Sequence, residues 1–366
     1  MRIIHVVGAR PNFMKVAPVL HALAGYPEVD QSLVHTGQHY DANMSDIFFE
    51  QLGLPAPDIN LGVGSGTHAK QTAEIMTRFE AVLETRRPDL VLVYGDVNST
   101  VAAALVCAKL GVLVGHVEAG LRSGDRTMPE EINRLITDQL ADLLFTPSED
   151  ANSNLRREGV SEEKIFCVGN VMIDSLIRLL PEARRRPRNG VPERYALMTL
   201  HRPANVDDHT ILGELLQSLR EISEDLAVVF PVHPRTRARL TQLGTTGIHM
   251  LEPQPYLDFL ALQCGATVVI TDSGGIQEET TFLGIPCLTL RENTERPITV
   301  SMGTNVIVGR NPHILRKELA KVLSGQTKKG TVPPLWDGKA ASRIAEIVTG
   351  KGRRVEEALH GQLLEV

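Results

Sequence analysis

Short apolar runs alternate with longer amphipathic stretches along nearly the whole chain. The apolar runs are typical of strands buried on both faces of a sheet, whereas the amphipathic stretches have the spacing of helices. The predicted strands are residues 3–7, 31–35, 90–94, 112–117, 143–145, 195–200, 226–231, 248–251, 267–271, 286–290 and 305–308. The predicted helices include residues 11–23, 69–83, 100–110, 130–140, 209–223 and 277–283, and a last one from Lys339 to Val348 and beyond. This alternation predicts an α/β fold of parallel sheets with helices on both faces.

A polar connector rich in proline and arginine, residues 181–192, interrupts the alternation near its middle. The chain of 366 residues is long enough for two domains that each bury a core. We therefore predict two doubly wound, Rossmann-like domains facing a cleft, formed by residues 1–175 and 176–349, with residues 350–366 returning to the first domain. Ligands of such sheets bind at the carboxyl ends of the strands, so the loops after the strands should carry the chemistry.

Composition narrows the setting of the protein. Hydrophobic residues at 42% and charged residues at 22% are typical of a globular chain, and the net charge of −6 argues against a nucleic-acid partner. The four cysteines are widely spaced, which predicts buried thiols in a reducing compartment. Met1 leads almost directly into the first predicted strand, and no apolar run is long enough to span a membrane, so we expect a cytoplasmic protein.

The segment after the predicted strand at 267–271 has the pattern of an anion site. A tight turn at residues 273–275 is followed by a helix start at Ile276. Its two glycines let the backbone approach a ligand closely, and the first N–H groups of the helix favour negative charge. Glu279 follows where a carboxylate can accept hydrogen bonds from a ribose diol. The alternative is an ordinary strand–turn–helix in which Glu278 and Glu279 only favour the helix start.

Charged side chains also follow several other predicted strands. Arg10 comes after the first strand and offers a planar fork for phosphate oxygens, and Lys15 lies in the helix that follows. Asp96, Glu118 and His201 follow three further strands. Carboxylates grouped at strand ends acquire different pKa values, which allows a general acid and a general base to coexist.

Each of these residues also has a plain structural interpretation. Asp96 and Glu130 could cap helices, and Arg134 could pair with a neighbouring glutamate on a solvated helix face. His201 could be a satisfied structural histidine. The same interpretation applies to other histidines: His5, His35, His68 and His116.

Two common nucleotide motifs are absent from the sequence. No G-x-G-x-x-G follows the first predicted strand, and the glycine-rich residues 62–66 lack the strand and helix of a dinucleotide site. No G-x-x-x-x-G-K-[ST] occurs either, which excludes a P-loop ATPase.

Seven motifs, in the same order along the chain, resemble the non-hydrolysing UDP-N-acetylglucosamine 2-epimerases. They are residues 8–18, 94–96, 115–122, 129–134, 231–234, 271–279 and 294–297. The resemblance implies a two-domain fold of the glycosyltransferase-B type, a homodimer, and interconversion of UDP-N-acetylglucosamine with UDP-N-acetylmannosamine for surface polysaccharide synthesis. It implies no metal and no redox cofactor.

The resemblance also assigns roles to individual residues. The implied ligands of the nucleotide diphosphate are Arg10, Lys15, Ser273, Gly274, Gly275 and Arg296. Glu279 would hold the ribose, Gln254 and Phe259 would lie near the uracil, and Arg134 and Arg202 would contact the substrate. The implied catalytic or supporting residues are Asp96, Glu118, Glu130 and His201. The candidate allosteric residues are Gln38, His39, Lys70 and His233.

The expected reaction explains this set of residues. The hydrogen on C2 of the sugar is not adjacent to a carbonyl, so a base alone cannot remove it. Departure of UDP from C1 acidifies that hydrogen, and a carboxylate completes an elimination to a 2-acetamidoglucal. Return of the proton to the opposite face of C2 inverts the sugar, which requires two acid/base groups and charged partners for the leaving diphosphate.

The sequence departs from the family pattern at three positions. Asn12 and Ala204 replace the glutamates expected there, and Ile298 replaces another common acid, while residues 38–41 match the stretch linked to activation by substrate only in part. These changes remove negative charge near the sugar, so the exact sugar and the allostery stay open. The alternative functions are a hydrolysing 2-epimerase, a 2-epimerase of another UDP-sugar, a UDP-sugar glycosyltransferase and a non-catalytic nucleotide-sugar binding protein.

Overall fold

The computed structural model describes residues 1–38, 49–206, 209–232, 237, 239–240 and 246–350. The chain divides into two compact units. Unit 1 consists of Met1–Ser175 together with the chain from Pro334 onward, and unit 2 is Leu176–Pro333. The return to unit 1 therefore begins before residue 350, where the sequence analysis had placed it.

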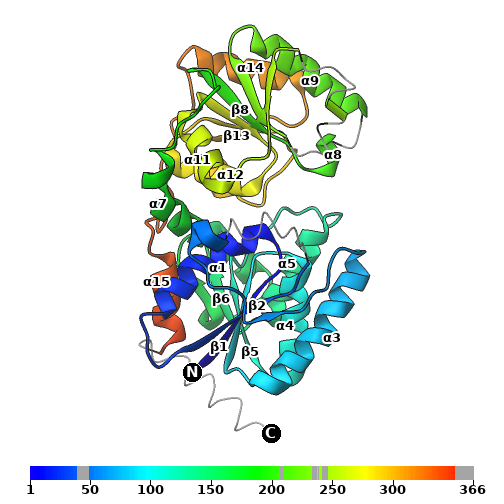
Figure 1. The fold of residues 1–366 in the computed structure, drawn as a ribbon, viewed down its shortest axis with the longest axis vertical. Coiled ribbons are helices and arrows are strands. Elements are labelled where there is room, and N and C mark those ends of the chain that lie inside the picture. The colour runs from blue at the N-terminus through cyan, green and yellow to red at the C-terminus, as the bar shows by residue number, and fades with distance from the viewer. Residues whose placement is uncertain (39–48, 207–208, 233–236, 238, 241–245, 351–366) are drawn as a thin grey trace. The chain divides into compact units, whose positions relative to one another are not determined.

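Unit 1 is built on a seven-stranded parallel sheet in the order β3-β2-β1-β4-β5-β6-β7 (Figure 1). The strands are β1 (Arg2–Val7), β2 (Asp30–His35), β3 (Ile59–Asn60), β4 (Leu90–Tyr94), β5 (Leu113–Val117), β6 (Leu143–Thr146) and β7 (Ile165–Cys167). The five strands predicted here are confirmed, with ends that differ by one residue at most. The order reverses between β1 and β4, which is the point where doubly wound sheets bind ligands.

The helices of unit 1 are α1 (Arg10–Leu23), α3 (His68–Arg86), α4 (Asn98–Leu110), α5 (Pro129–Leu140), α6 (Glu149–Arg157) and α15 (Ala340–Val348), and α7 (Val171–Ala183) continues into unit 2. Helix α15 packs against α1 and buries one face of small and aliphatic side chains. Asp174 accepts hydrogen bonds from the backbone N–H groups of Ala340 (3.3 Å) and Ala341 (2.8 Å). Because Asp174 satisfies the free donors at the start of α15, this helix is fixed to unit 1.

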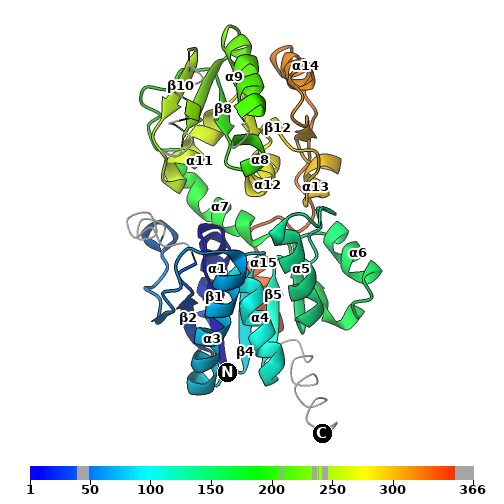
Figure 2. The same ribbon diagram turned by 90° about the vertical axis from the view of Figure 1, so that its right-hand side faces the viewer.

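Unit 2 contains a six-stranded parallel sheet in the order β10-β9-β8-β11-β12-β13 (Figure 2). Its strands are β8 (Tyr195–Thr199), β9 (Ala227–Pro231), β10 (Ile248–Leu251), β11 (Val268–Thr271), β12 (Cys287–Thr289) and β13 (Asn305–Ile307). Its helices are α8 (Pro203–Val206), α9 (His209–Ser223), α11 (Tyr256–Gly265), α12 (Gly274–Leu283), α13 (Pro297–Ser301) and α14 (Pro312–Leu323). Helices α9 and α14 pack side by side over one buried cluster, and α11 and α12 contribute to a second.

The predicted fold class is confirmed: both units are parallel, doubly wound α/β structures. One boundary near the predicted anion site differs from the sequence analysis. Gly274 and Gly275 belong to the first turn of α12, with Ser273 as its N-cap, instead of forming a turn ahead of the helix. Among the described residues, no helix is long and apolar enough to cross a membrane.

Candidate active site

The turn after β1 is joined to the end of β4 by the side chain of Asn12. The Asn12 Oδ1 accepts hydrogen bonds from the backbone N–H groups of Gly8 (3.0 Å) and Ala9 (3.1 Å). Its Nδ2 donates to the Tyr94 carbonyl at 2.7 Å. A glutamate carboxylate could not make this last contact because it has no proton to donate. Asn12 therefore fixes two neighbouring strand ends of the site.

Lys15 and Glu118 form a buried ion pair at these strand ends. The Lys15 Nζ donates to Glu118 Oε2, and the two residues are only 3% and 6% exposed. Gly95 borders the pair, and a Cβ at this glycine would lie 2.6 Å from Lys15 Nζ. The family resemblance implies that Lys15 binds the diphosphate. In the structure its partner is Glu118, and the phosphate role stays a prediction.

The backbone of Glu118 is in the left-handed region, with φ of 75°. For a residue with a Cβ this conformation costs roughly 1–2 kcal/mol, and strain of this kind concentrates at functional sites. The N–H groups of Glu118 and Ala119 both donate to the Phe145 carbonyl at 3.0 Å, which holds the strained turn. These two hydrogen bonds stabilise the strained turn, which fixes the position of the Glu118 backbone.

Asp96, at the end of β4, is paired with Arg134 of α5. The Arg134 Nη1 lies 2.5 Å from Asp96 Oδ2, and its Nε donates to Glu131 Oε2 at 3.0 Å. Glu131 also accepts hydrogen bonds from the N–H groups of Ser123 (3.0 Å) and Gly124 (2.8 Å). Burial alone would raise the pKa of Glu131, but the Ser123 N–H and the Arg134 guanidinium hold it below its usual value. Glu131 therefore aims Arg134 at Asp96.

The pairing of Arg134 with a neighbouring glutamate was considered in the sequence analysis as a solvated helix-face contact. The pair exists, but Arg134 and Glu131 are both buried. Glu130 has the opposite surroundings, since it is exposed in the first turn of α5. Within the described part of the chain, no hydrogen bond or ion pair holds its carboxylate. Glu130 is thus available to a ligand, whereas Glu131 is a structural partner.

Arg10, a predicted phosphate ligand, is half-buried at the first position of α1.

Two of the four candidate allosteric residues can be located. The Gln38 Oε1 accepts hydrogen bonds from the Ser99 N–H (3.0 Å) and hydroxyl (2.7 Å) at the start of α4. Lys70 is exposed in the first turn of α3. His39 and His233 lie outside the described residues, so the allosteric role stays a prediction.

Asp272, directly after β11, organises the strand ends of unit 2. This buried carboxylate accepts hydrogen bonds from the backbone N–H of Arg202 (2.9 Å) and from Asn205 Nδ2 (3.0 Å). It is also 2.8 Å from His201 Nδ1. Burial alone would raise the pKa of Asp272, but the His201 ring and these donors hold it below its usual value. His201 is thereby oriented while its side chain stays 61% exposed.

Arg296 lies against the first turn of α12. A Cβ at Gly274 would lie 2.3 Å from Arg296 Nη1, so a larger residue here would displace the guanidinium from the first turn of the helix. The Arg296 Nη1 is 2.5 Å from Glu295 Oε1, and its Nε is 3.0 Å from Glu278 Oε1. On its other side, Glu295 Oε2 is 2.7 Å from Arg291 Nη2. The structure thus brings a guanidinium and a helix N-terminus together, which is the pairing that an anion site requires.

Glu279 is buried one turn further along α12, beside a tyrosine of α11. The Tyr256 hydroxyl donates to Glu279 Oε1 at 2.8 Å. Burial raises the pKa of Glu279 to about 7. Of the two residues predicted to lie near a uracil, Phe259 packs on the cluster formed with Tyr195, and Gln254 donates to the Glu252 carbonyl at 2.7 Å.

The raised pKa of Glu279 predicts a pH-dependent stability of unit 2. A carboxyl with a folded-state pKa near 7 and an ordinary value of 4.5 favours the folded state fully below pH 4.5. This contribution is lost as the pH rises through about 7, and it is on the order of a few kcal/mol. Glu279→Gln keeps the acceptor for Tyr256 and removes the titration. The variant should therefore be more stable than the wild type at pH 8 and close to it at pH 5.

Thermal unfolding at both pH values measures this difference. Glu252→Gln, which changes an exposed glutamate of the same unit, is the matched control. An equal pH dependence in wild type and Glu279→Gln would show that Glu279 does not titrate in this range.

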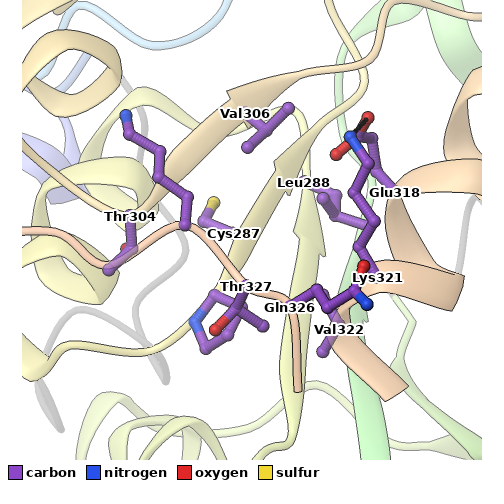
Figure 3. A pocket seen from close by; sticks show the side chains of 11 residues that line it. Cys287, Leu288, Thr304, Val306, Glu318, Lys321, Val322, Gln326 and Thr327 are labelled. Atoms are coloured by element: carbon purple, nitrogen blue, oxygen red, sulfur yellow. Dashed lines mark hydrogen bonds and ion pairs between the residues drawn. The ribbon is translucent and has the colours of Figure 1, made fainter. Parts of the chain in front are cut away.

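A cavity of about 250 Å³ in unit 2 lies apart from these residues (Figure 3). Cys287, Leu288 and Val306 line it from β12 and β13, and Glu318 and Lys321 from α14. It is at the amino ends of these strands, and none of the predicted site residues lines it.

In the residues that the structure describes, no group of three or more His, Cys, Asp or Glu side chains could hold a metal ion.

The two doubly wound units form a fold of the glycosyltransferase-B type, with charged residues after the strands of each unit. Comparison with known proteins narrows this class further. The family model for UDP-N-acetylglucosamine 2-epimerase matches residues 21–349. The chain therefore belongs to the UDP-N-acetylglucosamine 2-epimerase family.

Two curated relatives are similar over nearly their full length. The UDP-N-acetylglucosamine 2-epimerase of Methanocaldococcus jannaschii is 44% identical over 365 residues, covering 95% of this chain and 99% of the relative. The UDP-2,3-diacetamido-2,3-dideoxy-D-glucuronate 2-epimerase of Pseudomonas aeruginosa is 43% identical over 350 residues, covering 94% and 99%. The crystal structure of the M. jannaschii UDP-GlcNAc 2-epimerase in complex with UDP-GlcNAc and UDP has a TM-score of 0.89, with 95% and 99% of the two chains covered.

Proposed function

We propose that the protein is a non-hydrolysing 2-epimerase that interconverts UDP-N-acetylglucosamine and UDP-N-acetylmannosamine. Family membership supports the class of reaction. The observation that carries the mechanism is the group of acids at the strand ends of unit 1. Glu118 is held there in a strained backbone conformation against Lys15, next to the Asp96–Arg134 pair.

The reaction begins with cleavage of the bond between C1 and the UDP oxygen, and the electron pair leaves with UDP. Positive charge at C1 acidifies the C2 hydrogen, and a carboxylate removes this hydrogen as a proton. The C2–H electron pair then forms the C1=C2 bond of a 2-acetamidoglucal. A second acid then protonates the other face of C2 as the UDP oxygen returns to C1. Both proton transfers are general acid–base steps, and each requires a group on its own face of the ring.

Unit 2 would hold the nucleotide during this sequence. The N-terminus of α12 and the guanidinium of Arg296 favour the negative charge that develops on the departing diphosphate. Arg202, near Glu295, would add a further positive charge, and Arg10 of unit 1 is a further proposed diphosphate ligand. Glu279 would accept hydrogen bonds from the ribose once it is ionised.

Unit 1 would supply the groups that move protons. Asp96 and Glu118 are each paired with a cation that fixes the direction of the carboxylate, and we assign both to proton transfer. Glu130 is exposed at the start of α5 and would serve as a further acid/base or as a stabiliser of charge at C1. His201 is proposed to support the chemistry from unit 2, with Asp272 fixing its orientation.

A proton NMR time course with UDP-N-acetylglucosamine in heavy water tests the proposal. Elimination exposes C2 to solvent protons, so we expect deuterium at C2 in the product together with a new anomeric signal of the mannosamine sugar. Epimerised product without deuterium at C2 would contradict the elimination route. Release of free N-acetylmannosamine and UDP would instead identify a hydrolysing 2-epimerase.

A second substrate is favoured by one specific observation. The P. aeruginosa relative is named as a 2-epimerase of UDP-2,3-diacetamido-2,3-dideoxy-D-glucuronate, and it is 43% identical to this chain. The M. jannaschii relative, named for UDP-N-acetylglucosamine, is 44% identical. Asn12, Ala204 and Ile298 remove negative charge from three motifs, which suits a sugar that carries its own carboxylate. The same time course with UDP-2,3-diacetamido-2,3-dideoxy-glucuronate distinguishes the two substrates by their ratio of kcat/KM.

We also propose that the enzyme acts as a homodimer in the cytoplasm and supplies a precursor of surface polysaccharide. The resemblance of the seven motifs supports this setting, and light scattering after size-exclusion chromatography tests the dimer. A mass corresponding to one chain of 40.1 kDa would contradict it.

A further inference from the structure

A fully buried histidine lies directly behind the proposed catalytic acids and has no part in the mechanism above. His116 is on β5, and its Nε2 is 2.8 Å from the Gly95 carbonyl. Its Nδ1 is 2.6 Å from Asp138 Oδ1 on α5. The other oxygen of Asp138 accepts a hydrogen bond from the Gly120 N–H at 3.0 Å. His116 and Asp138 thus connect the backbone just before Asp96 with the backbone just after Glu118.

We propose that His116 is a positioning residue, held as an imidazolium by Asp138, which fixes the Asp96 turn against the Glu118 turn. The inference rests on the proposed function, because it concerns the spacing of the two carboxylates assigned to proton transfer. It adds a residue that acts through the backbone and does not contact the sugar.

The hydrogen-bond partners determine the charge of the ring. A backbone carbonyl can only accept, so the Nε2 that faces Gly95 must carry a proton. A carboxylate also only accepts, so Nδ1 must carry a second proton if Asp138 is ionised. Asp138 accepts a hydrogen bond from the Gly120 N–H and lies beside the Arg122 guanidinium, and both contacts favour its ionised form. The proposal therefore requires a ring that donates at both nitrogens and carries a positive charge.

The charges around the ring are balanced by groups from several elements. Arg122, in the loop after β5, lies 2.7 Å from Asp138 Oδ2. The same guanidinium forms two hydrogen bonds with Glu158, at the end of α6, of 2.7 and 2.6 Å. With the ring charged as proposed, two cations and two carboxylates form a closed set, which removes the main cost of burying a charged histidine.

The cluster of His116, Asp138, Arg122 and Glu158 lies where it can fix the positions of the two proposed catalytic acids. Gly95 immediately precedes Asp96, and Gly120 follows Glu118 by two residues. Helix α5, which carries Asp138, also carries Arg134, the partner of Asp96. One buried cluster therefore contacts the backbone beside both acids and the helix that orients one of them. A displacement of about 1 Å in a reacting group can lower the rate on the order of a hundredfold.

Kinetics of His116→Gln and His116→Phe with UDP-N-acetylglucosamine test the positioning role. Both variants remove the positive charge, and we expect kcat to fall about tenfold to a hundredfold while UDP affinity, measured by calorimetry, stays within about twofold. The matched control is His5→Gln, since His5 is equally buried on β1 but contacts Tyr94 and Gln31. If the phenylalanine variant does not fold, His116→Gln, which keeps a polar side chain, decides the result.

Nitrogen NMR of the histidine rings in the wild-type enzyme tests the charge independently of activity. With His116→Gln used to assign the signal, we expect both ring nitrogens to be protonated at neutral pH. A neutral ring, a kcat within twofold of the His5→Gln control, or a loss of UDP affinity as large as the loss of kcat would each overturn the proposal. If the wild type does not turn over UDP-N-acetylglucosamine, the proposed function fails, and the ring signal still decides the charge of His116.

Discussion

Replacing Glu118 by Gln is expected to lower kcat by about a hundredfold to ten-thousandfold, with UDP affinity unchanged or slightly improved. Glutamine keeps the size and the hydrogen-bonding capacity of the side chain but cannot accept a proton from C2. UDP is itself an anion, so the loss of a nearby negative charge does not weaken its binding. A fall in kcat at constant UDP affinity therefore identifies a group that acts in chemistry and not in nucleotide binding.

Glu118→Gln also leaves the Lys15 ammonium buried without its carboxylate, which could lower the stability of unit 1. Glu118→Asp provides a second variant that keeps a carboxylate on the same side of Lys15. Aspartate tolerates the left-handed conformation better than most residues and keeps the charge, while its carboxylate is one methylene shorter. We expect Glu118→Asp to fold normally and to lose most of its activity, because the base no longer reaches C2.

Asp96→Asn and Glu130→Gln should have the same direction of effect on kcat. The matched control is Glu149→Gln, since Glu149 is an exposed glutamate of unit 1 that pairs with Arg156 on the surface. Full activity in all three acid variants would show that none of these residues takes part in the chemistry. A much weaker binding of UDP by the variants would make them supports of the nucleotide site and would favour a glycosyltransferase.

The strands could be predicted from the sequence because each is a short apolar run with polar residues at its ends. Strands β3 and β7 were missed, since they have two and three residues and are only partly buried. The return of the chain at Pro334 was placed too late for a different reason. It depends on Trp336 and Asp174, whose hydrogen bonds join segments that are more than a hundred and fifty residues apart.

The charged residues at strand ends were also predictable, because a parallel sheet brings all its carboxyl ends to one edge. Most of the residues that orient them were not predictable. Glu131, Asp272 and Tyr256 each orient a predicted site residue, yet each looks like an ordinary helix or loop residue in the sequence. Glu131 had the strongest signal, since it lies three residues before Arg134 on α5. His116 and Asp138 come from different elements, so no local pattern relates them.

Arg296→Ala is expected to weaken UDP binding about tenfold to a hundredfold and to lower turnover as well. This follows from the loss of a charge-assisted hydrogen bond to phosphate, which is worth roughly 1.5–3 kcal/mol. The guanidinium is already oriented for this role, because Glu295 and Glu278 hold it against the first turn of α12. Arg10→Ala should act in the same direction if Arg10 also contacts the diphosphate.

Arg296→Ala has a structural cost that must be separated from its effect on binding. It leaves the Glu278 carboxylate buried without Arg296, and breaking a buried pair in this way costs about 3–5 kcal/mol. Arg296→Lys keeps the positive charge but loses the planar fork that matches phosphate oxygens. Weaker UDP binding by a well-folded lysine variant would therefore measure the contribution of the fork itself.

Calorimetric titration of UDP into both variants makes the distinction. Arg310→Ala is the control, since Arg310 is an exposed arginine of unit 2 that pairs with Glu292 away from α12. A normal UDP affinity in both Arg296 variants would remove Arg296 from the nucleotide site and leave it a structural role beside Glu278. A loss of UDP affinity in Arg296→Ala alone would mean that the positive charge of Arg296 matters and the planar shape of its guanidinium does not. Because the diphosphate can accept two parallel hydrogen bonds, we expect both variants to lose affinity, the alanine variant more than the lysine variant.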